Sequence, residues 1–291
     1  MGRQGVRFHY LSKLFCLCLL LHHVPSTGNV VIAEFRGSPT SDKYKTSIEG
    51  WLNTGHNAVV KTLGPVAQEH IPIQINVTTT AQEAVPWGEV IRGKLDSIEL
   101  RVNKFSQPET LSADWTLYHE LSHLYHPLFA YPDFWLAEGF ATYFQNIVML
   151  QNGIYSQDEF IRRMRDGLAR GQKSMRTYPG RLDTISSDMW RLRAYQRVYW
   201  SGVGFFIEAE HTLRKVNAKY TISELISHYQ RCCRGKEREG HVTSAQEFVT
   251  ALDNLSGHKV FNPLYQRYRR TQSFPQISNE QLKSLIHLYT H

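Results

Sequence analysis

Trp115-Thr-Leu-Tyr-His-Glu-Leu-Ser-His123 and Trp135-Leu-Ala-Glu-Gly-Phe-Ala-Thr-Tyr-Phe144 are the two stretches from which the fold of this 291-residue chain can be predicted. His119 and His123 are four positions apart, so on a helix they share one face and both imidazoles can reach a single metal ion. Glu120 then lies beside that metal, where its carboxylate can take a proton from a metal-activated water. The first stretch therefore predicts a metal-binding helix.

The second stretch supplies a third ligand, Glu138, in mostly apolar surroundings next to Gly139, a residue that permits close backbone approach. A carboxylate in such surroundings is costly unless it is paired or coordinated. Two histidines and one glutamate leave a fourth position for water, which is typical of catalytic rather than structural zinc, and we expect one zinc ion per chain. The alternatives are a surface helix with two unrelated histidines and a salt-bridged glutamate.

The two motifs together resemble those of the gluzincin metallopeptidases, especially the aminopeptidase-N-like and glycyl-aminopeptidase-like members. The resemblance implies a thermolysin-like (zincin) fold of class α+β, with a small N-terminal α/β lobe, a C-terminal all-helical lobe and zinc between them. It implies that His119, His123 and Glu138 are the zinc ligands and that Glu120 is the general base.

A third motif, Val198-Tyr-Trp-Ser-Gly-Val-Gly-Phe-Phe206, is similar to the segment that holds the catalytic tyrosine of those families. Tyr199 precedes Gly202 by the family's interval of three residues, so the resemblance implies that Tyr199 stabilises the oxyanion of the tetrahedral intermediate. Tyr195, one helical turn earlier, is the alternative donor. A tyrosine that only packs through its ring is a further alternative.

The sequence also departs from the family pattern. The gap between His123 and Glu138 is shorter than in aminopeptidase-N-like enzymes, and their Gly-x-Met-Glu-Asn motif, which holds the substrate's free amino terminus, has no counterpart. Pro86-Trp-Gly-Glu89 offers only Glu89 as a weak candidate for that role. His126, three residues beyond His123, is expected to have a rim or core role rather than to bind metal. Exopeptidase and endopeptidase activity both stay open.

Hydrophobic periodicity predicts that strands precede a long run of helices, with the junction near a helix over 112–126 that begins at the N-cap Ser112. The expected strands cover residues 30–35, 71–77 and 98–102. The expected helices cover residues 42–63, 112–126, 133–151, 156–171, 194–217, 221–233, 243–255, 261–270 and 278–288. The predicted divisions are residues 1–28, 29–127 for the α/β lobe that ends in the metal-binding helix, and 128–291 for the helical lobe.

Residues 1–28 have the pattern of a signal peptide. Positive charges at Arg3, Arg7 and Lys13 precede the apolar run 14–21, and small residues follow up to Gly28. Eight apolar residues are too few to span a bilayer core of ~30 Å. We therefore expect export to the periplasm or the medium with cleavage near Gly28, with an uncleaved membrane anchor as the alternative.

The formal net charge of +7 is concentrated in arginines and lysines between residues 162 and 181. A solvated helical face and loop is the expected explanation, and contact with an anionic surface or the cell envelope is the alternative. The sequence contains no nucleic-acid-binding motif, so no specific nucleic-acid partner is expected. Outside the signal, Cys232 and Cys233 are neighbours and do not form a disulfide framework between segments.

These observations predict a zinc-dependent metallopeptidase that hydrolyses peptide bonds in a peptide or protein substrate. Two alternatives remain: a catalytically weak, peptidase-like binding or scaffold protein of the envelope, and a zinc hydrolase of a non-peptide substrate, as leukotriene hydrolase is within a related family. A binding module needs neither Glu120 nor Tyr199, so their presence favours hydrolysis. The sequence leaves side-chain preference and oligomeric state open.

Overall fold

A computed structural model describes residues 29–38, 40–234 and 242–290. The predicted signal peptide lies outside the described residues. Among the residues that are described, no helix is both long and apolar enough to cross a membrane.

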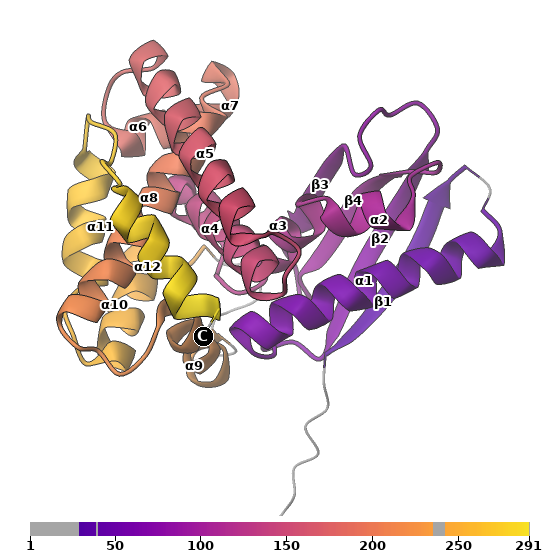
Figure 1. The fold of residues 1–291 in the computed structure, drawn as a ribbon, viewed down its shortest axis with the longest axis horizontal. Helices are drawn as coiled ribbons and strands as arrows, with labels where there is room; N and C mark the ends of the chain where they lie inside the picture. The colour runs from indigo at the N-terminus through magenta and orange to yellow at the C-terminus, as the bar shows by residue number, and fades with distance from the viewer. Residues whose placement is uncertain (1–28, 39, 235–241, 291) are drawn as a thin grey trace, which may run out of the picture.

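The first part of the described chain forms a four-stranded sheet with the order β1-β2-β4-β3. Its strands are β1 (Val30–Gly37), β2 (His70–Thr78), β3 (Trp87–Ile91) and β4 (Ser97–Asn103). β2 pairs in parallel with β1 and with β4, whereas β3 is an antiparallel edge strand on β4. The long helix α1 (Asp42–Leu63) connects β1 to β2 and runs along the sheet (Figure 1).

Alternation predicted β2 and β4, and an apolar stretch predicted β1. In β2, every second residue from Ile71 to Val77 is buried, as the alternation of isoleucine and valine with polar residues requires. β3 was not predicted, because Gly88 interrupts its short segment and the strand is only partly buried. This missed strand borders the functional site.

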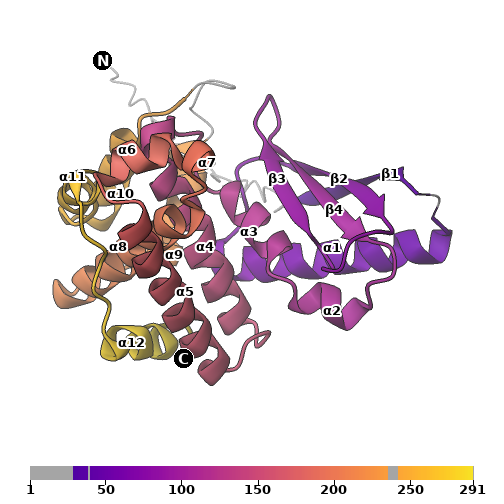
Figure 2. The ribbon, with the colours of Figure 1, turned by 90° about the horizontal axis from the view of Figure 1, so that it is seen from above.

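After β4 the described chain is helical (Figure 2). The helices are α2 (Pro108–Ala113), α3 (Thr116–His123), the 3-10 turn η1 (Tyr131–Asp133), α4 (Phe134–Gln151), α5 (Gln157–Thr177), α6 (Leu182–Ser187), α7 (Met189–Leu192), α8 (Tyr195–Lys215), α9 (Ile222–Cys232), α10 (Ala245–Ser256), α11 (Phe261–Arg270) and α12 (Asn279–Thr290). The protein is thus mixed α/β with mostly helical content. The predicted division at residue 127 stays a prediction.

The predicted helix over 112–126 was wrong in its extent, since the structure divides it into α2 and α3. Asp114 between them is extended, with φ −73° and ψ 135°, and its Oδ1 accepts a hydrogen bond from the Thr116 amide at 2.8 Å. An aspartate that binds a backbone amide two residues ahead competes with continuation of the helix. Ser112 therefore lies inside α2 and is not the N-cap of the metal-binding helix.

The closest helix packing in the site region joins α4 to α8 at Gly139 and Gly202. A Cβ built on Gly202 would lie 2.0 Å from the Trp135 carbonyl oxygen and 2.5 Å from the Gly139 Cα. The sequence indicated close approach at Gly139, and the structure identifies Gly202 as its partner. This contact fixes the relative position of the two helices that carry Glu138 and Tyr199.

Cys232 and Cys233 form a disulfide at the end of α9. Because the two residues are neighbours, the bond connects no separate segments, which agrees with the expectation that the pair forms no framework. Stability rests instead on the buried core that continues from α1 and the sheet into the helices.

We predict that Gly202→Ala lowers the free energy of unfolding by about 1–3 kcal/mol or more, because its methyl group would collide with backbone that cannot rotate away. Urea denaturation of the purified protein measures the change. Gly50→Ala is the matched control: Gly50 lies inside α1 and a Cβ there meets no atom within 4 Å. This control should be neutral or stabilising by up to about 1 kcal/mol, and equal urea midpoints for the two variants would contradict the prediction.

Candidate metal centre and active-site cleft

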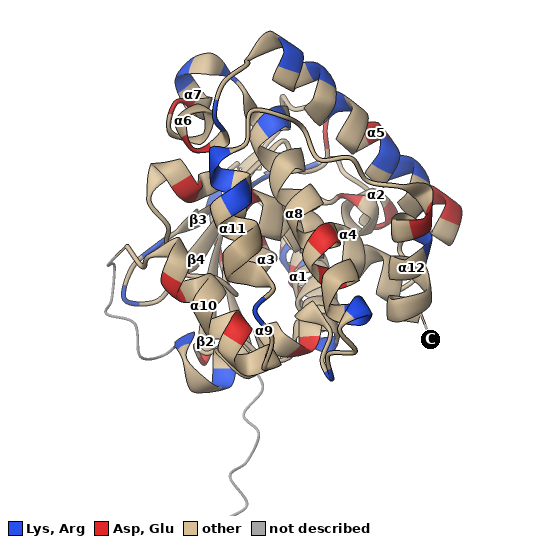
Figure 3. Cartoon of the chain, turned by 90° about the vertical axis from the view of Figure 1, so that its left-hand side faces the viewer, with Lys and Arg blue, Asp and Glu red and all other residues tan. Residues whose placement is uncertain are grey.

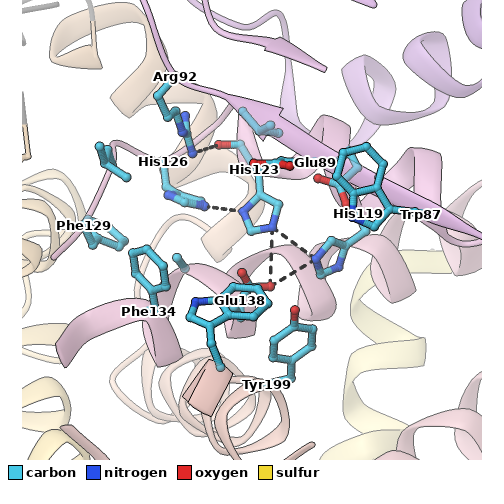
Figure 4. A pocket seen from close by; sticks show the side chains of 16 residues that line it. Trp87, Glu89, Arg92, His119, His123, His126, Phe129, Phe134, Glu138 and Tyr199 are labelled. Carbon is cyan, nitrogen blue, oxygen red and sulfur yellow. Dashed lines mark hydrogen bonds and ion pairs between the residues drawn. The ribbon is translucent and has the colours of Figure 1, made fainter. Parts of the chain in front are cut away.

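A cleft of about 370 Å³ lies between the edge strand β3 and helices α3, α4 and α8. Its lining includes His119, His123, Glu138, Glu120 and Tyr199, five residues that the sequence had marked as the site. Figure 4 shows the side chains of His119, His123 and Glu138 pointing toward one another, with Tyr199 beside them.

The three predicted ligands converge on one point. His119 and His123 come from successive turns of α3, and Glu138 comes from the first half of α4. Glu138 Oε2 lies 3.3 Å from His119 Nε2 and 3.6 Å from His123 Nε2, and the two Nε2 atoms are 3.1 Å apart. One nitrogen of each imidazole and one carboxylate oxygen thus lie close enough together to bind a single metal ion.

The opposite nitrogens of both rings are held by neighbours that fix their protons. His119 Nδ1 lies 2.8 Å from Gln145 Oε1, an acceptor, so the Nδ1 carries the hydrogen. His126 Nδ1 lies 2.7 Å from the Pro127 carbonyl oxygen and must donate to it. Burial first, and then Arg92 and His123, hold the pKa of His126 well below its usual range, so this ring is neutral and its Nε2 accepts. His126 Nε2 is 2.8 Å from His123 Nδ1, which therefore donates.

It follows that both Nε2 atoms present lone pairs to each other and to the Glu138 carboxylate. Three such atoms this close, with Glu138 Oε2 otherwise lacking a hydrogen-bond partner among the described residues, repel one another unless a cation lies between them. Two imidazole nitrogens and a carboxylate oxygen are the donor set of catalytic zinc sites. The residues present therefore fit a zinc ion.

The electrostatics of the centre favour a positive charge beside Glu138. Burial lowers the pKa of His123 to about 4, which keeps the ring neutral. Burial alone would also lower the pKa of His119, but the Glu138 and Glu120 carboxylates outweigh it and raise the pKa. Burial would raise the pKa of Glu138, yet the two imidazoles lower it well below its usual range. Glu138 is thus ionised at neutral pH.

Glu120 is 6 % exposed and lies at the floor of the cleft against β3. Burial raises its pKa to about 7, where a carboxyl group can both accept and release a proton near neutral pH. A Cβ on Gly88 would lie 2.7 Å from Glu120 Cγ and 2.8 Å from Thr116 Cγ2. Gly88 is therefore the residue of β3 that leaves room for this carboxylate.

Tyr199 and Tyr195 have different surroundings. The Tyr199 ring stacks on His119, with centroids 5.9 Å apart and an interplanar angle of 18°, and it lines the cleft. Burial, and then Glu138, raise the pKa of Tyr199 well above its usual range, so the hydroxyl keeps its proton. Tyr195 packs instead against Trp190 at 5.3 Å. The geometry favours Tyr199 as a hydrogen-bond donor toward the metal centre.

Sequence reasoning missed the residues that support the ligands. His126 is buried, in agreement with the expected rim or core role, but its contact with His123 Nδ1 was not predicted. Gln145 was not identified at all, although it lies seven residues after Glu138 and therefore on the same face of α4. Arg92 donates through Nη2 to the His123 carbonyl oxygen at 2.8 Å and thereby binds the end of α3. No motif in the sequence marked it.

We predict that Gln145→Ala weakens zinc binding about 10–100-fold, because His119 loses the acceptor that orients it. Competition against a chelator of known affinity measures the effect. Gln145→Glu restores an acceptor and should retain tight binding, and Gln151→Ala, on the same helix but without a histidine contact, should leave affinity unchanged. Zinc affinity in Gln145→Ala equal to that of the parent would show that the contact does not support the site.

Comparison with protein families gives one match. Residues 121–203 match the model of the M61 glycyl aminopeptidase family. The matched segment contains His123, Glu138 and Tyr199 and begins just after Glu120. No curated protein in the comparison matches the sequence.

Two solved structures share the fold of this chain. An aminopeptidase N family protein from Idiomarina loihiensis superposes with a TM-score of 0.59 at 12% identity, over 87% of this chain and 46% of its own. Yeast LTA4 hydrolase in complex with bestatin gives 0.55 at 14% identity, over 87% of this chain and 39% of its own. The chain thus spans less than half the length of these two structures. The chain therefore shares the fold of these two structures, and its segment 121–203 is similar to the M61 glycyl aminopeptidases.

Proposed function

We propose that this protein is a zinc-dependent metallopeptidase that hydrolyses peptide bonds. One observation carries the proposal: two imidazole lone pairs and a carboxylate converge beside Glu120, a second buried carboxylate whose pKa is near neutrality. A structural zinc site needs no such neighbour. A zinc ion on His119, His123 and Glu138 would supply a Lewis acid that polarises a carbonyl group and makes water a nucleophile at neutral pH.

The chain's own residues would move the proton. Glu120 accepts it from the attacking water and then passes it to the nitrogen of the departing amine. A pKa of about 7 suits both transfers, because the proton is neither held too tightly nor released too readily. Gly88 permits the carboxylate to lie beneath the scissile bond, and the wall of β3 restricts its movement.

Tyr199 would stabilise the charge that develops on the carbonyl oxygen. Its hydroxyl is protonated and lies in the cleft, and ring stacking on His119 limits its position. A donor that is already in place when charge develops lowers the barrier without reorganisation.

The edge strand β3 would align the substrate. In the sheet β3 pairs only with β4, so its other edge can bind an extended peptide through main-chain hydrogen bonds. Glu89 lines the cleft on this strand and is one residue from Gly88. A carboxylate at this point would pair with a free amino terminus, so we propose an aminopeptidase-type specificity with Glu89 as the amine-binding residue.

The N-terminal segment adds a location to this proposal. We propose that residues 1–28 direct export and are removed near Gly28, as their charge and apolar pattern indicate. N-terminal sequencing of the protein recovered outside the cytoplasm tests this proposal. A mature chain that begins far from residue 29 would contradict it.

Two variants test the catalytic roles. Glu120→Gln and Tyr199→Phe should retain zinc but lose peptide hydrolysis by about 10²–10⁴-fold and about 10²–10³-fold in kcat, respectively. Metal analysis and steady-state kinetics on the same preparations measure both. Tyr195→Phe, which removes a hydroxyl outside the cleft, should leave kcat nearly unchanged. Parent-like cleavage by the zinc-loaded Glu120→Gln variant would refute the mechanism.

Peptides with free and acetylated amino termini test the specificity. We expect at least about tenfold faster cleavage of the free peptides, because a hydrogen bond between an ammonium group and a carboxylate is stronger than one between neutral groups. Glu89→Gln should reduce this preference mainly through KM. Equal cleavage of both sets would show that the enzyme is an endopeptidase and that Glu89 binds no amine, while the metal chemistry would stand.

A further inference from the structure

A second hollow of about 290 Å³ adjoins the cleft between the start of α3 and helices α4, α5 and α8. Tyr199 lines both cavities, so the hollow begins where the proposed oxyanion donor stands. Trp115 forms another part of its wall, 43 % exposed, and its ring contacts His119 edge-on with centroids 5.5 Å apart. The hollow therefore lies beside the metal centre, and Tyr199 forms part of the wall of both cavities.

Positive charge dominates the rim of the hollow. Its charged lining residues are three arginines and one aspartate of α5, namely Arg162, Arg163, Arg170 and Asp166. Figure 3 shows lysines and arginines along this helix. A solvated helical face, which the sequence led us to expect, does not account for the position of this charge beside the metal centre.

Two of these arginines retain binding capacity. Arg162 forms ion pairs with Glu159 through Nη2 and with Asp166 through Nη1, the latter at 3.3 Å. Arg163 uses Nε toward Glu159 and lies over the Tyr155 ring at 4.5 Å. Arg170 uses Nε toward Gln196 at 2.9 Å and lies over the Trp200 ring at 5.6 Å. Glu159 and Gln196 thereby position the two guanidinium groups. Among the described residues, no acceptor takes a hydrogen bond from the η nitrogens of Arg163 or Arg170.

The inner wall of the hollow is polar as well. Thr142, Gln145 and Asn146 of α4 line it, all buried. Thr142 is 4 % exposed, and its hydroxyl has no hydrogen-bond partner in the described part of the chain. A buried hydroxyl without a partner is costly, so a ligand that binds here would gain by satisfying it. A charged helix face that is merely solvated would not explain the buried Thr142 hydroxyl that lacks a partner within the described ranges.

We infer that the hollow is a subsite for a carboxylate of the substrate, bound by Arg163 and Arg170. The inference rests on the proposed peptidase function and narrows it to peptides with an anionic group on the side of the scissile bond nearer Trp115. Guanidinium groups bind carboxylates with fork geometry, and the exposed rim lets the group keep part of its hydration. The carboxylate can be the C-terminus of a short peptide or the side chain of aspartate or glutamate.

Binding of short peptides to the zinc-loaded Glu120→Gln variant tests the subsite without turnover. The probes are Ala-Ala-Ala, Ala-Ala-Ala-amide, Ala-Ala-Glu-amide and Ala-Ala-Gln-amide, with dissociation constants from calorimetry. We expect at least one acidic peptide to bind about tenfold or more tightly than its neutral partner. An advantage of the free terminus alone assigns the site to the C-terminus, and an advantage of glutamate assigns it to a side chain.

Matched double variants in the same background locate the effect. Arg163→Gln/Arg170→Gln should abolish the advantage of acidic peptides and leave the affinity of neutral peptides unchanged. Arg165→Gln/Arg176→Gln removes the same charge from exposed positions of α5 outside the hollow and should retain the advantage. Arg163→Lys/Arg170→Lys keeps the charge and should retain part of it, which separates loss of the contact from loss of the fold.

The outcomes distinguish this inference from the proposed function. Equal affinity for acidic and neutral peptides, or equal loss in both glutamine double variants, overturns the subsite. If the parent enzyme nevertheless cleaves neutral peptides, the proposed peptidase function stands. If the parent neither binds nor cleaves any of these peptides or a broader peptide library, both are overturned.

Discussion

The site depends on the contact between α4 and α8 at Gly139 and Gly202. Helix axes can approach this closely only where neither residue has a side chain, and a methyl group at either position would enter the backbone of the other helix. Glu138 precedes the first glycine, and Tyr199 lies one turn before the second. A carboxylate and a tyrosine that are 61 positions apart in the sequence therefore share one cleft because two glycines bring their helices together.

Near that contact, a chain of hydrogen bonds determines which ring nitrogen of each histidine carries the proton. The Pro127 carbonyl fixes the proton of His126, His126 fixes that of His123, and Gln145 fixes that of His119. The result is a set of lone pairs that all point inward. Burial strengthens these interactions, because hydrogen bonds are electrostatically stronger in a protein interior than in water. The same burial raises the pKa of Glu120 to about 7, so the environment that orients the proposed ligands also brings this carboxyl group toward neutrality.

Much of this could be predicted from the sequence, and the exceptions have physical reasons. α1 and α11 were predicted with their observed bounds, because both have amphipathic patterns, and α1 also begins at the N-cap Ser41 and ends at Gly64. The three ligands were predicted from local spacing, and the structure brings them together. β3 escaped prediction because an edge strand with a glycine has neither alternation nor a continuous apolar run. Gln145, His126 and Arg92 escaped because their partners are set by packing between elements. The buried Arg197, which donates to the carbonyl oxygens of Tyr178 and Gly180, escaped for the same reason.

The position of the ligands along the chain has a consequence for the entropic cost of folding. One continuous segment, consisting of α3, α4 and the residues that join them, contains the three proposed ligands and their supporting residues His126 and Gln145. Closing so short a loop costs little entropy compared with joining distant segments. The three ligands can therefore be brought together by α3 and α4 alone, at a lower entropic cost than the contacts with Tyr199 and the edge strand. A metal ion that binds them would favour the native arrangement of α3 and α4 by mass action.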